Sequence, residues 1–431
     1  MRLEFHGAAR EVGRSCIELT TKQGSRFLLD IGVKFGEGGL IFPQKVLDVL
    51  NIDGTFISHA HLDHSGGLPL FEHKHLHGPI FCTSQTLAIS KILLKDSYKV
   101  ARIKHLHPAY DNADLKQVQK DARIVQFDKW YSCKDIRFMF LNAGHIPGSA
   151  MILIEADGKR LLYTGDFNNR DTALMEHEII DGVLREKPLD VLIIESTYAY
   201  RDLPDNEELK NRFVESVKET ISEGGSVLVP TFALGRAQQI LMMLGDAGIN
   251  VNIYLDGMCN KITRKILETP SKYIKNKDVL SDIFYNKIHW ISSAKKRKDA
   301  LKNQGVFITS SGMLQGGPVL SYLKELWHDE KNKIALMGFQ CKRTNGRYLF
   351  DEGFVYLDGW KTFVKCKVEK FDFSGHADSV GIKHIVRELK PKHVFFQHGD
   401  EESVLKLKEW ADSELESNNY APAVTEIFDI N

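Results

Sequence analysis

Short runs of β-forming residues, separated by turns, fill about the first 200 residues of the chain. Hairpin-type turns such as Lys22-Gln23-Gly24-Ser25 and Asp157-Gly158-Lys159 join several of these runs. The pattern predicts strands at residues 3–5, 26–30, 55–58, 136–141, 151–155, 160–164 and 191–195. We therefore expect this half of the chain to be dominated by strands.

From about residue 205 the pattern changes to alternating helices and strands. Apolar residues at helical spacing form three faces: Leu209, Phe213, Val217 and Ile221; Ala237, Ile240, Leu241 and Leu244; and Val319, Leu323, Leu326 and Trp327. Short apolar runs at 226–229, 251–255, 306–308 and 334–337 lie between or beside these faces. Such alternation predicts a parallel sheet covered by helices, and so a second domain.

The last part of the chain returns to the pattern of short β-forming runs seen in the first part. Residues 393–396 form a short buried strand that ends next to His398. We therefore expect the helix-and-strand region to be inserted within a domain that the two ends of the chain build together, rather than two domains in tandem.

Composition narrows the class of protein. At 431 residues the chain is too long for one compact core, and 43% hydrophobic with 26% charged residues is typical of a soluble globular protein. No run approaches the ~20 apolar residues of a membrane span, and no signal sequence is visible, so we expect a cytoplasmic protein without membrane contact. The six scattered cysteines predict buried thiols. Basic and acidic residues balance at 57 each, so positive potential for a polyanion would have to be local.

The segment His59-Ala60-His61-Leu62-Asp63-His64 places four metal-ligand side chains within six residues, directly after an apolar strand. Two histidines at this spacing on a loop can converge on one ion, while the following Asp and His turn toward a second. Neutral imidazole together with carboxylate is a ligand set that zinc prefers. The segment therefore predicts the core of a two-metal site.

Three further ligand-type residues come directly after predicted strands: His145, Asp166 and His398. Each alone has an even chance of being an ordinary hydrogen-bonded polar residue. Residues at the ends of adjacent strands meet at one edge of a sheet, where active sites collect. We expect all three to join the HxHxDH segment.

The motifs HAHLDH, GHIPGSAM, YTGDF, ESTYA, GRAQQ, SSGML, FSGHADS and FFQHGD follow one another along the chain. In this order they resemble the β-CASP branch of the metallo-β-lactamase superfamily, and most of all its RNA-cleaving members. The resemblance implies an α/β fold: an αββα metallo-β-lactamase sandwich with an inserted β-CASP α/β domain. We place the first part of the metallo-β-lactamase domain at residues 1–202, the insertion at 203–360 and the C-terminal part at 361–431.

The resemblance also implies roles for the ligand-type residues. His59, His61 and His145 would hold one zinc, Asp63, His64 and His398 a second, and Asp166 would bridge the two. A hydroxide between the two Zn²⁺ would be the nucleophile. His376 would contact the scissile phosphate and protonate the leaving oxygen, oriented by Glu195, and Asp63 is counted with these two as a catalytic residue.

The substrate assignment rests on the resemblance as well. RNA-directed relatives keep a histidine at the position of His398, whereas DNA-directed relatives have an apolar residue there. Arg236, at the start of a predicted helix, and the loop residues Ser311, Gly312 and Met313 could hold backbone phosphates. Glycine at a strand-to-helix turn is more often plain turn chemistry, so the loop alone is weak evidence.

The leading hypothesis is a zinc-dependent ribonuclease that cuts single-stranded RNA, as an endonuclease, a 5′-to-3′ exonuclease or both, in RNA processing or decay. A homodimer or an RNA-processing complex is a further expectation, since the segment after Ala421 could pair as an edge strand or fold back. The rivals are a DNA nuclease of the same fold, a hydrolase of small esters or lactones, and a non-catalytic RNA-binding scaffold.

Overall fold

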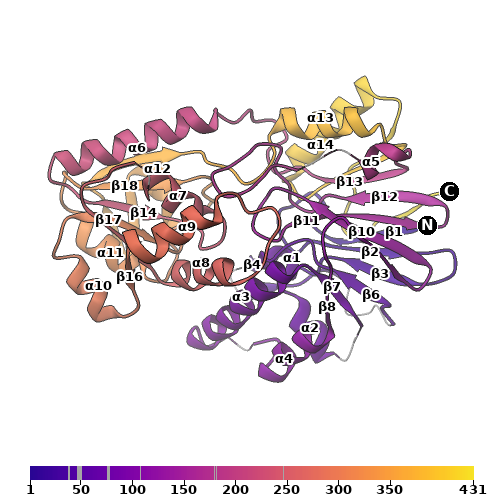
Figure 1. Cartoon of the computed structure of the whole chain (residues 1–431), viewed down its shortest axis with the longest axis horizontal. Coiled ribbons are helices and arrows are strands. Elements are labelled where there is room, and N and C mark those ends of the chain that lie inside the picture. The colour runs from indigo at the N-terminus through magenta and orange to yellow at the C-terminus, as the bar shows by residue number, and fades with distance from the viewer. Residues whose placement is uncertain are drawn as a thin grey trace.

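The structure is a computed structural model that describes residues 1–36, 39–45, 51–74, 78–106, 108–178, 180, 182–245 and 247–431. Two seven-stranded sheets and one six-stranded sheet organise the described residues, with two additional two-stranded hairpins. The two seven-stranded sheets belong to one half of the molecule and the six-stranded sheet to the other (Figure 1).

The first seven-stranded sheet has the order β24-β1-β2-β3-β6-β7-β8. Its strands are β1 (Arg2–Gly7), β2 (Cys16–Thr20), β3 (Arg26–Leu29), β6 (Gly54–Phe56), β7 (Ile80–Cys82), β8 (Ala122–Ile124) and β24 (Ile427–Asp429). β24 pairs antiparallel with β1, so the C-terminal segment folds back on its own chain. Both chain ends therefore lie at the same side of the sandwich (Figure 1).

The second seven-stranded sheet has the order β23-β22-β13-β12-β11-β10-β9. Its strands are β9 (Trp130–Cys133), β10 (Ile136–Asn142), β11 (Ala150–Ala156), β12 (Lys159–Tyr163), β13 (Val191–Glu195), β22 (His393–Gln397) and β23 (Asn418–Tyr420). β22 lies parallel to β13 although about 200 residues separate them in sequence. The end of the chain thus completes a sheet that its first half begins.

A single apolar core fills the space between these two sheets. Phe5 and Phe56 from the first sheet and Phe138, Ile152 and Phe395 from the second are all fully buried in it. The rings of Phe56 and Phe138 meet edge to face with centroids 4.7 Å apart, an arrangement that aromatic pairs prefer. Large apolar side chains at alternate strand positions are what hold the two sheets face to face.

Helices cover the outer face of each sheet. The first sheet carries α1 (Leu62–Ser65), α2 (Leu68–His73), α3 (Ser84–Ile103) and α4 (Asn112–Asp121), and the second carries α5 (Val183–Glu186), α13 (Ser379–Leu389) and α14 (Glu401–Glu414). Buried residues such as Leu68 and Val118 on the first sheet, and Ile385 and Leu407 on the second, anchor them. The layers run helix, sheet, sheet, helix, so the predicted αββα sandwich is confirmed.

The six-stranded sheet is parallel throughout and has the order β16-β15-β17-β14-β18-β21. Its strands are β14 (Val227–Pro230), β15 (Asn252–Asp256), β16 (His289–Ile291), β17 (Gly305–Thr309), β18 (Lys333–Met337) and β21 (Lys367–Phe371). Its helices are α6 (Asn206–Ser222), α7 (Arg236–Gly245), α8 (Met258–Glu268), α9 (Lys277–Asp282), the π-helix η2 (Ile283–Lys287), α10 (Ala294–Ala300), α11 (Val319–Leu326) and α12 (Asn345–Glu352). The predicted inserted α/β region is confirmed, while the residue-level division of the chain at 202 and 360 stays a prediction.

The two small hairpins are β4–β5 (Lys34–Gly36 and Gly39–Ile41) and β19–β20 (Phe354–Leu357 and Trp360–Phe363). The second hairpin precedes β21 and packs beside α12. None of the helices in the described ranges is both long and apolar enough to cross a membrane.

Candidate metal centre

The HxHxDH segment follows strand β6: residues 59–61 lie in the connection to helix α1, and residues 62–64 lie in α1 itself. Its backbone is fixed by the loops after β1 and β3: Ser15 N donates to Asp63 O at 2.8 Å, and Ile31 N donates to His64 O at 2.9 Å. Gly32 allows this close approach, because a Cβ at that position would lie 1.6 Å from Asp63 O. The ligand-type side chains therefore project from a loop and the helix that follows it, and neighbouring loops hold that helix in place.

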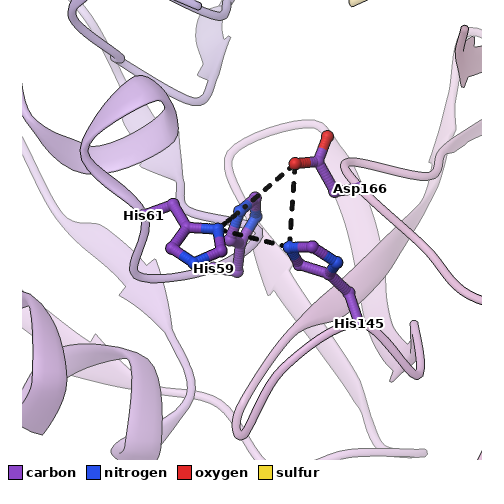
Figure 2. Close-up of side chains that lie close together, drawn as sticks. All are labelled: His59, His61, His145 and Asp166. Carbon is purple, nitrogen blue, oxygen red and sulfur yellow. Dashed lines mark hydrogen bonds and ion pairs between the residues drawn. The ribbon is translucent and has the colours of Figure 1, made fainter. Parts of the chain in front are cut away.

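Four of the predicted residues form a first donor set: His59, His61, His145 and Asp166 (Figure 2). His61 Nδ1 lies 3.2 Å from His59 Nε2 and 3.2 Å from His145 Nε2. Asp166 Oδ2 lies 3.5 Å from His59 Nε2 and 3.8 Å from His145 Nε2. Residues from three separate loops thus turn their donor atoms to one point.

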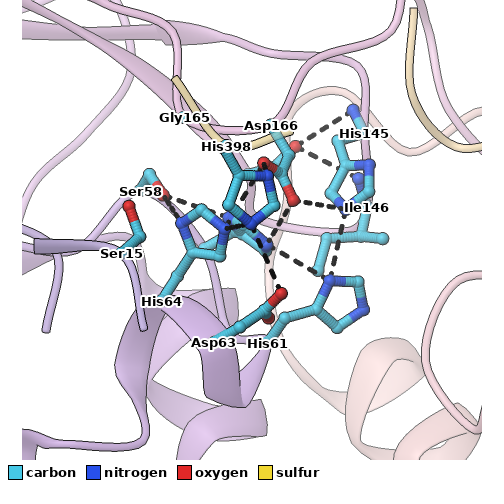
Figure 3. Close-up of polar contacts among 12 residues, drawn as sticks. Ser15, Ser58, His61, Asp63, His64, His145, Ile146, Gly165, Asp166 and His398 are labelled. Carbon is cyan, nitrogen blue, oxygen red and sulfur yellow. Dashed lines mark hydrogen bonds and ion pairs between the residues drawn. The ribbon is translucent and has the colours of Figure 1, made fainter. Parts of the chain in front are cut away.

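A second donor set shares Asp166 with the first and adds His64 and His398 (Figure 3). Asp166 Oδ1 lies 3.3 Å from His64 Nε2 and 3.0 Å from His398 Nδ1. Asp63 lies beside this set, with its Oδ2 3.5 Å from His398 Nε2, and its side chain is 32% exposed. Asp166 therefore presents one carboxylate oxygen to each set.

The donor atoms fit metal ions better than they fit one another. Asp166 Oδ1 and His398 Nδ1 are buried and have no hydrogen-bond partner, although they are only 3.0 Å apart. Tetrahedral zinc with Zn–N bonds of about 2.0–2.1 Å keeps its ligand nitrogens about 3.3 Å apart, close to the His–His separations of 3.2 and 3.3 Å in this site. Imidazoles with carboxylates are also the donor chemistry that zinc selects.

The electrostatics separate the histidines into two kinds. Burial lowers the pKa of His59 and His145 well below the ordinary histidine value, which favours the neutral imidazole that binds metals. Burial also opposes the charged form of His398, but the negative charge of Asp166 outweighs it and raises the pKa to about 10. Without a cation, a proton on His398 is thus what balances the buried carboxylate.

Asp30 is part of this site and the sequence did not single it out. Its Oδ2 lies 2.6 Å from His64 Nδ1, and it accepts hydrogen bonds from Tyr163 OH at 2.6 Å and Ser58 Oγ at 2.7 Å. Its Oδ1 accepts from Ser58 N at 2.7 Å. The signal was visible, since Asp30 is a charged residue at the end of the apolar run Phe27-Leu28-Leu29. Through His64 Nδ1 it fixes the ring whose Nε2 faces Asp166.

His376 and Glu195 lie together beside the first set, where the His376 and His145 ring centroids are 4.6 Å apart. His376 Nδ1 donates to Glu195 Oε1 at 3.1 Å and Oε2 at 3.0 Å, and Glu195 Oε1 also accepts from Phe167 N at 2.8 Å. The Glu195 side chain is fully buried, whereas the His376 side chain is 22% exposed. Burial lowers the pKa of His376, but Glu195 and Asp166 raise it, with a net result above the ordinary value. A carboxylate therefore orients a histidine that stays accessible.

The predicted phosphate-contact residues lie at the carboxyl ends of strands β14 and β17 in the inserted sheet. Arg236 begins α7, and its guanidinium lies 5.6 Å from the ring of Phe373, in the segment that leads to His376. Burial lowers the pKa of Arg236 to about 10. Gly235, just before it, lies against Ile146 of the His145 loop. The structure thus brings Arg236 beside two of the loops that form the site.

The loop Ser311-Gly312-Met313 lies against the connection between β14 and α7. A Cβ on Gly312 would lie 3.1 Å from Phe232 N. The Ser311 hydroxyl accepts from Gln315 N at 3.1 Å and donates to Gly316 O at 3.3 Å, so it stabilises the loop itself. These contacts of Ser311 lie within the turn, and phosphate binding by the loop stays a prediction.

Comparison with known proteins agrees with this geometry. Family models match at residues 237–349 (Beta-Casp domain), 363–422 (Zn-dependent metallo-hydrolase RNA specificity domain) and 14–194 (Anti-Pycsar protein Apyc1). A "Probable RNase MJ4" of Methanocaldococcus jannaschii is 37% identical over 95% of this chain and 96% of its own length. The chain belongs to the RNA-processing β-CASP family of the metallo-β-lactamase superfamily.

Two further comparisons extend this picture of the β-CASP chain. An "RNase aCSPSF2" of Saccharolobus solfataricus is 32% identical over 96% of this chain and 82% of its own length. A solved structure of a protein of unknown function from Enterococcus faecalis V583 covers 99% of both chains with a TM-score of 0.63 and 13% identity. The last similarity concerns the fold alone.

Proposed function

We propose that this β-CASP protein is a zinc-dependent ribonuclease that hydrolyses phosphodiester bonds of single-stranded RNA. One observation carries the proposal: the His376–Glu195 pair adjoins a set of seven ligand-type residues, five of which are buried. Only 3.9 Å separates His376 Nδ1 from Asp166 Oδ2. A metal site alone fits many hydrolases, whereas an oriented histidine beside it supplies the proton that an RNA leaving oxygen needs.

We assign His59, His61 and His145 to one zinc, Asp63, His64 and His398 to the other, and Asp166 to both. Two bound zinc ions would lower the pKa of a water toward neutrality and neutralise charge on the phosphodiester oxygens. The protein itself fixes the orientation of the ligand side chains through neighbouring groups. Asp30 fixes His64, and Gly375 O, 2.6 Å from His145 Nδ1, fixes His145.

His376 is the proton donor in this proposal. Because its Nδ1–H is engaged by Glu195, Nε2 is the ring atom left to face the substrate. Glu195 and Asp166 raise the pKa of His376 and so favour its protonated form, which can give a proton to the departing 3′ oxygen and leave a 3′ hydroxyl and a 5′ phosphate. Arg236, beside the same segment, contributes positive charge for a neighbouring backbone phosphate.

The named ribonucleases among the relatives support RNA as the substrate. The histidine at position 398 supports RNA over DNA. All seven ligand positions carry a histidine or an aspartate, which argues against a non-catalytic scaffold. The six cysteines are all free, which supports action in the cytoplasm.

The experiment is a competition between matched single-stranded RNA and DNA oligomers, each labelled at either end and carrying a 5′ hydroxyl or a 5′ monophosphate. We expect RNA cleavage that a chelator abolishes and zinc restores, and the fragment pattern reveals endonucleolytic or 5′-to-3′ cutting. His59→Ala and Asp166→Ala should abolish cleavage. His73→Ala is the matched control, because His73 is a half-exposed surface histidine that pairs with Asp114.

Cleavage that persists after His59→Ala would refute the metal assignment. Equal turnover of DNA would favour the DNA-nuclease alternative. Turnover of a simple lactone at a rate comparable to RNA would favour a small-ester hydrolase.

A further inference from the structure

Tyr198 and Arg236 contact opposite ends of the short segment that carries His376. The guanidinium of Arg236 lies 5.6 Å from the ring of Phe373, at the start of this segment. Tyr198 forms an isolated parallel β-bridge with Asp378, at its end. The Tyr198 ring also meets the His376 ring edge to face, with centroids 6.1 Å apart. Both side chains therefore border the histidine that is the proton donor in the proposed function.

Arg236 is a cation without a partner anion. Its guanidinium donates to the side-chain oxygen of Gln239, and within the described ranges it forms no ion pair with a carboxylate. The side chain is partly buried, and burial lowers its pKa to about 10. Removing a charge from water costs free energy unless an opposite charge or hydrogen bonds replace the water. Arg236 is therefore suited to an anion, and in the proposed substrate that anion is a backbone phosphate.

The hydroxyl of Tyr198 lies within electrostatic range of this guanidinium. Burial raises the pKa of Tyr198, and the positive charge of Arg236 opposes that shift. The Tyr198 side chain is partly exposed, and its hydroxyl makes no hydrogen bond to any residue that the structure describes. A phenol hydroxyl donates readily to a phosphate oxygen. Tyr198 thus offers a donor beside the cation.

The acids in the surroundings of Tyr198 already have other partners. Asp372 Oδ1 lies 2.6 Å from Lys370 Nζ, and Glu195 Oε2 accepts from His376 Nδ1 at 3.0 Å. These pairs leave the charge of the guanidinium beside Tyr198 uncompensated. Such a local excess of positive charge complements a phosphodiester, although the chain as a whole has no net charge.

We propose that Tyr198 is a further substrate-contact residue, whose hydroxyl and Arg236 together hold the RNA phosphate next to the scissile one. The inference rests on the proposed function and deepens it, because it names the second group of a phosphate subsite. The ring of Tyr198 packs on His376, so a phosphate held by its hydroxyl would fix the RNA strand relative to the proton donor.

The test measures binding separately from cleavage. Fluorescence anisotropy gives the Kd of the zinc-loaded protein for a single-stranded RNA in a His376→Asn background, which removes the proton donor and keeps all seven ligand-type residues. The variants are Tyr198→Phe, Arg236→Gln and the two combined. Tyr285→Phe is the matched control, because Tyr285 is a 46% exposed tyrosine beside the edge strand β16.

We expect Tyr198→Phe to raise the Kd about ten-fold, the lower limit for a lost hydrogen bond to a charged group, and Tyr285→Phe to leave it unchanged. Arg236→Gln should reduce the slope of log K against log salt by about 0.7, the value for one phosphate contact on a single strand, whereas Tyr198→Phe should leave that slope as it is. The combined variant should lose less than the product of the two single effects, because both groups bind one phosphate.

Cleavage by the single variants, with His376 intact, adds a second readout. The loss in Tyr198→Phe should appear in KM rather than in kcat, because phenylalanine keeps the ring against His376 and loses only the phosphate contact. A purely structural role of the ring predicts an unchanged KM in this variant. Tyr198→Phe is the milder substitution and decides the outcome by itself if Arg236→Gln does not fold.

An unchanged Kd in Tyr198→Phe, or a combined variant that loses the full product of the single effects, would overturn the inference. So would coupling of the two substitutions in the Tm of the RNA-free protein, since the two side chains would then act on each other and not through a phosphate. The proposed function fails separately: wild-type protein that binds the RNA without cleaving it contradicts that function and leaves the comparison of Kd values interpretable.

Discussion

Replacing Asp30 by asparagine should weaken metal binding although none of the seven ligand-type residues is substituted. Asp30 Oδ2 receives three contacts, from His64 Nδ1, Ser58 Oγ and Tyr163 OH, and Oδ1 receives Ser58 N. An amide NH₂ at the Oδ2 position faces His64 Nδ1 and forces the imidazole proton onto Nε2, the nitrogen that faces Asp166. In the flipped orientation the NH₂ meets the Ser58 N–H, so neither amide orientation satisfies the site.

The size of the effect follows from the role of such supporting carboxylates, whose loss lowers metal affinity by about 10- to 100-fold. That range corresponds to about 1.4 to 2.8 kcal/mol of binding free energy. Tyr163→Phe is the matched control, because it removes one donor from the same oxygen and leaves His64 paired. We expect its effect on affinity to stay below about ten-fold.

Competition with a chromogenic chelator measures zinc affinity directly, and RNA cleavage as a function of free zinc provides a second readout. Asp30→Asn should need more zinc for half-maximal cleavage and should approach the wild-type rate when zinc saturates. The thermal transition of the metal-free protein reports whether the variant folds. An Asp30→Asn protein that folds and binds zinc as tightly as wild type would refute the reasoning.

Three further predictions concern proton transfer and burial. His376→Ala should lower kcat about 10²- to 10⁴-fold while bound zinc stays unchanged by elemental analysis, and loss of the metal together with activity would contradict a proton-donor role. Because Glu195 raises the pKa of His376, Glu195→Gln should move the alkaline limb of the pH–rate profile to lower pH, since the protonated acid is then lost earlier as pH rises; an unmoved limb would exclude His376 as the acid. Burial raises the pKa of Glu178 to about 8, so the folded state retains a proton that the unfolded state releases, and stability falls as pH rises from about 4.5 to 8. Glu178→Gln should therefore gain thermal stability relative to wild type between pH 5 and pH 8, and a constant difference in Tm over that interval would show that Glu178 ionises freely.

The central strands were predictable because their side chains carry the signal themselves. Runs such as 136–141 and 191–195 are apolar on both faces, as strands covered by helices and a second sheet must be. Helix α3 was not predicted, because its buried face is partly polar. Its buried face includes Gln85, Thr86 and Ser90, so burial there depends on partners such as the backbone of Ile266 and not on an apolar stripe.

The candidate site was predictable where ligands follow strands and was missed where function depends on a distant partner. His145, Asp166 and His398 each follow a strand, so topology brings them together once the sheet forms. Asp30 acts through His64, 34 residues away, and its local signal, a carboxylate at the end of an apolar run, is shared with other strand ends. The burial of Arg236 likewise depends on Phe373, which packing brings beside it from far along the chain.

The β19–β20 hairpin was not predicted as an element from the sequence. Phe354, Val355 and Leu357 are buried by the inserted sheet and its helices, while Trp360 and Phe363 remain exposed. A sequence pattern alone cannot separate aromatic residues that fill a core from those that face solvent, because the same residue types serve both.

Titration of the metal-free protein with zinc tests the proposed zinc-dependent ribonuclease activity, if bound zinc per chain and the rate of single-stranded RNA cleavage are measured on the same samples. We expect no cleavage by the metal-free protein and a rate that saturates when two zinc ions are bound per chain. Cleavage by metal-free protein, or full activity with no bound metal detected, would contradict it.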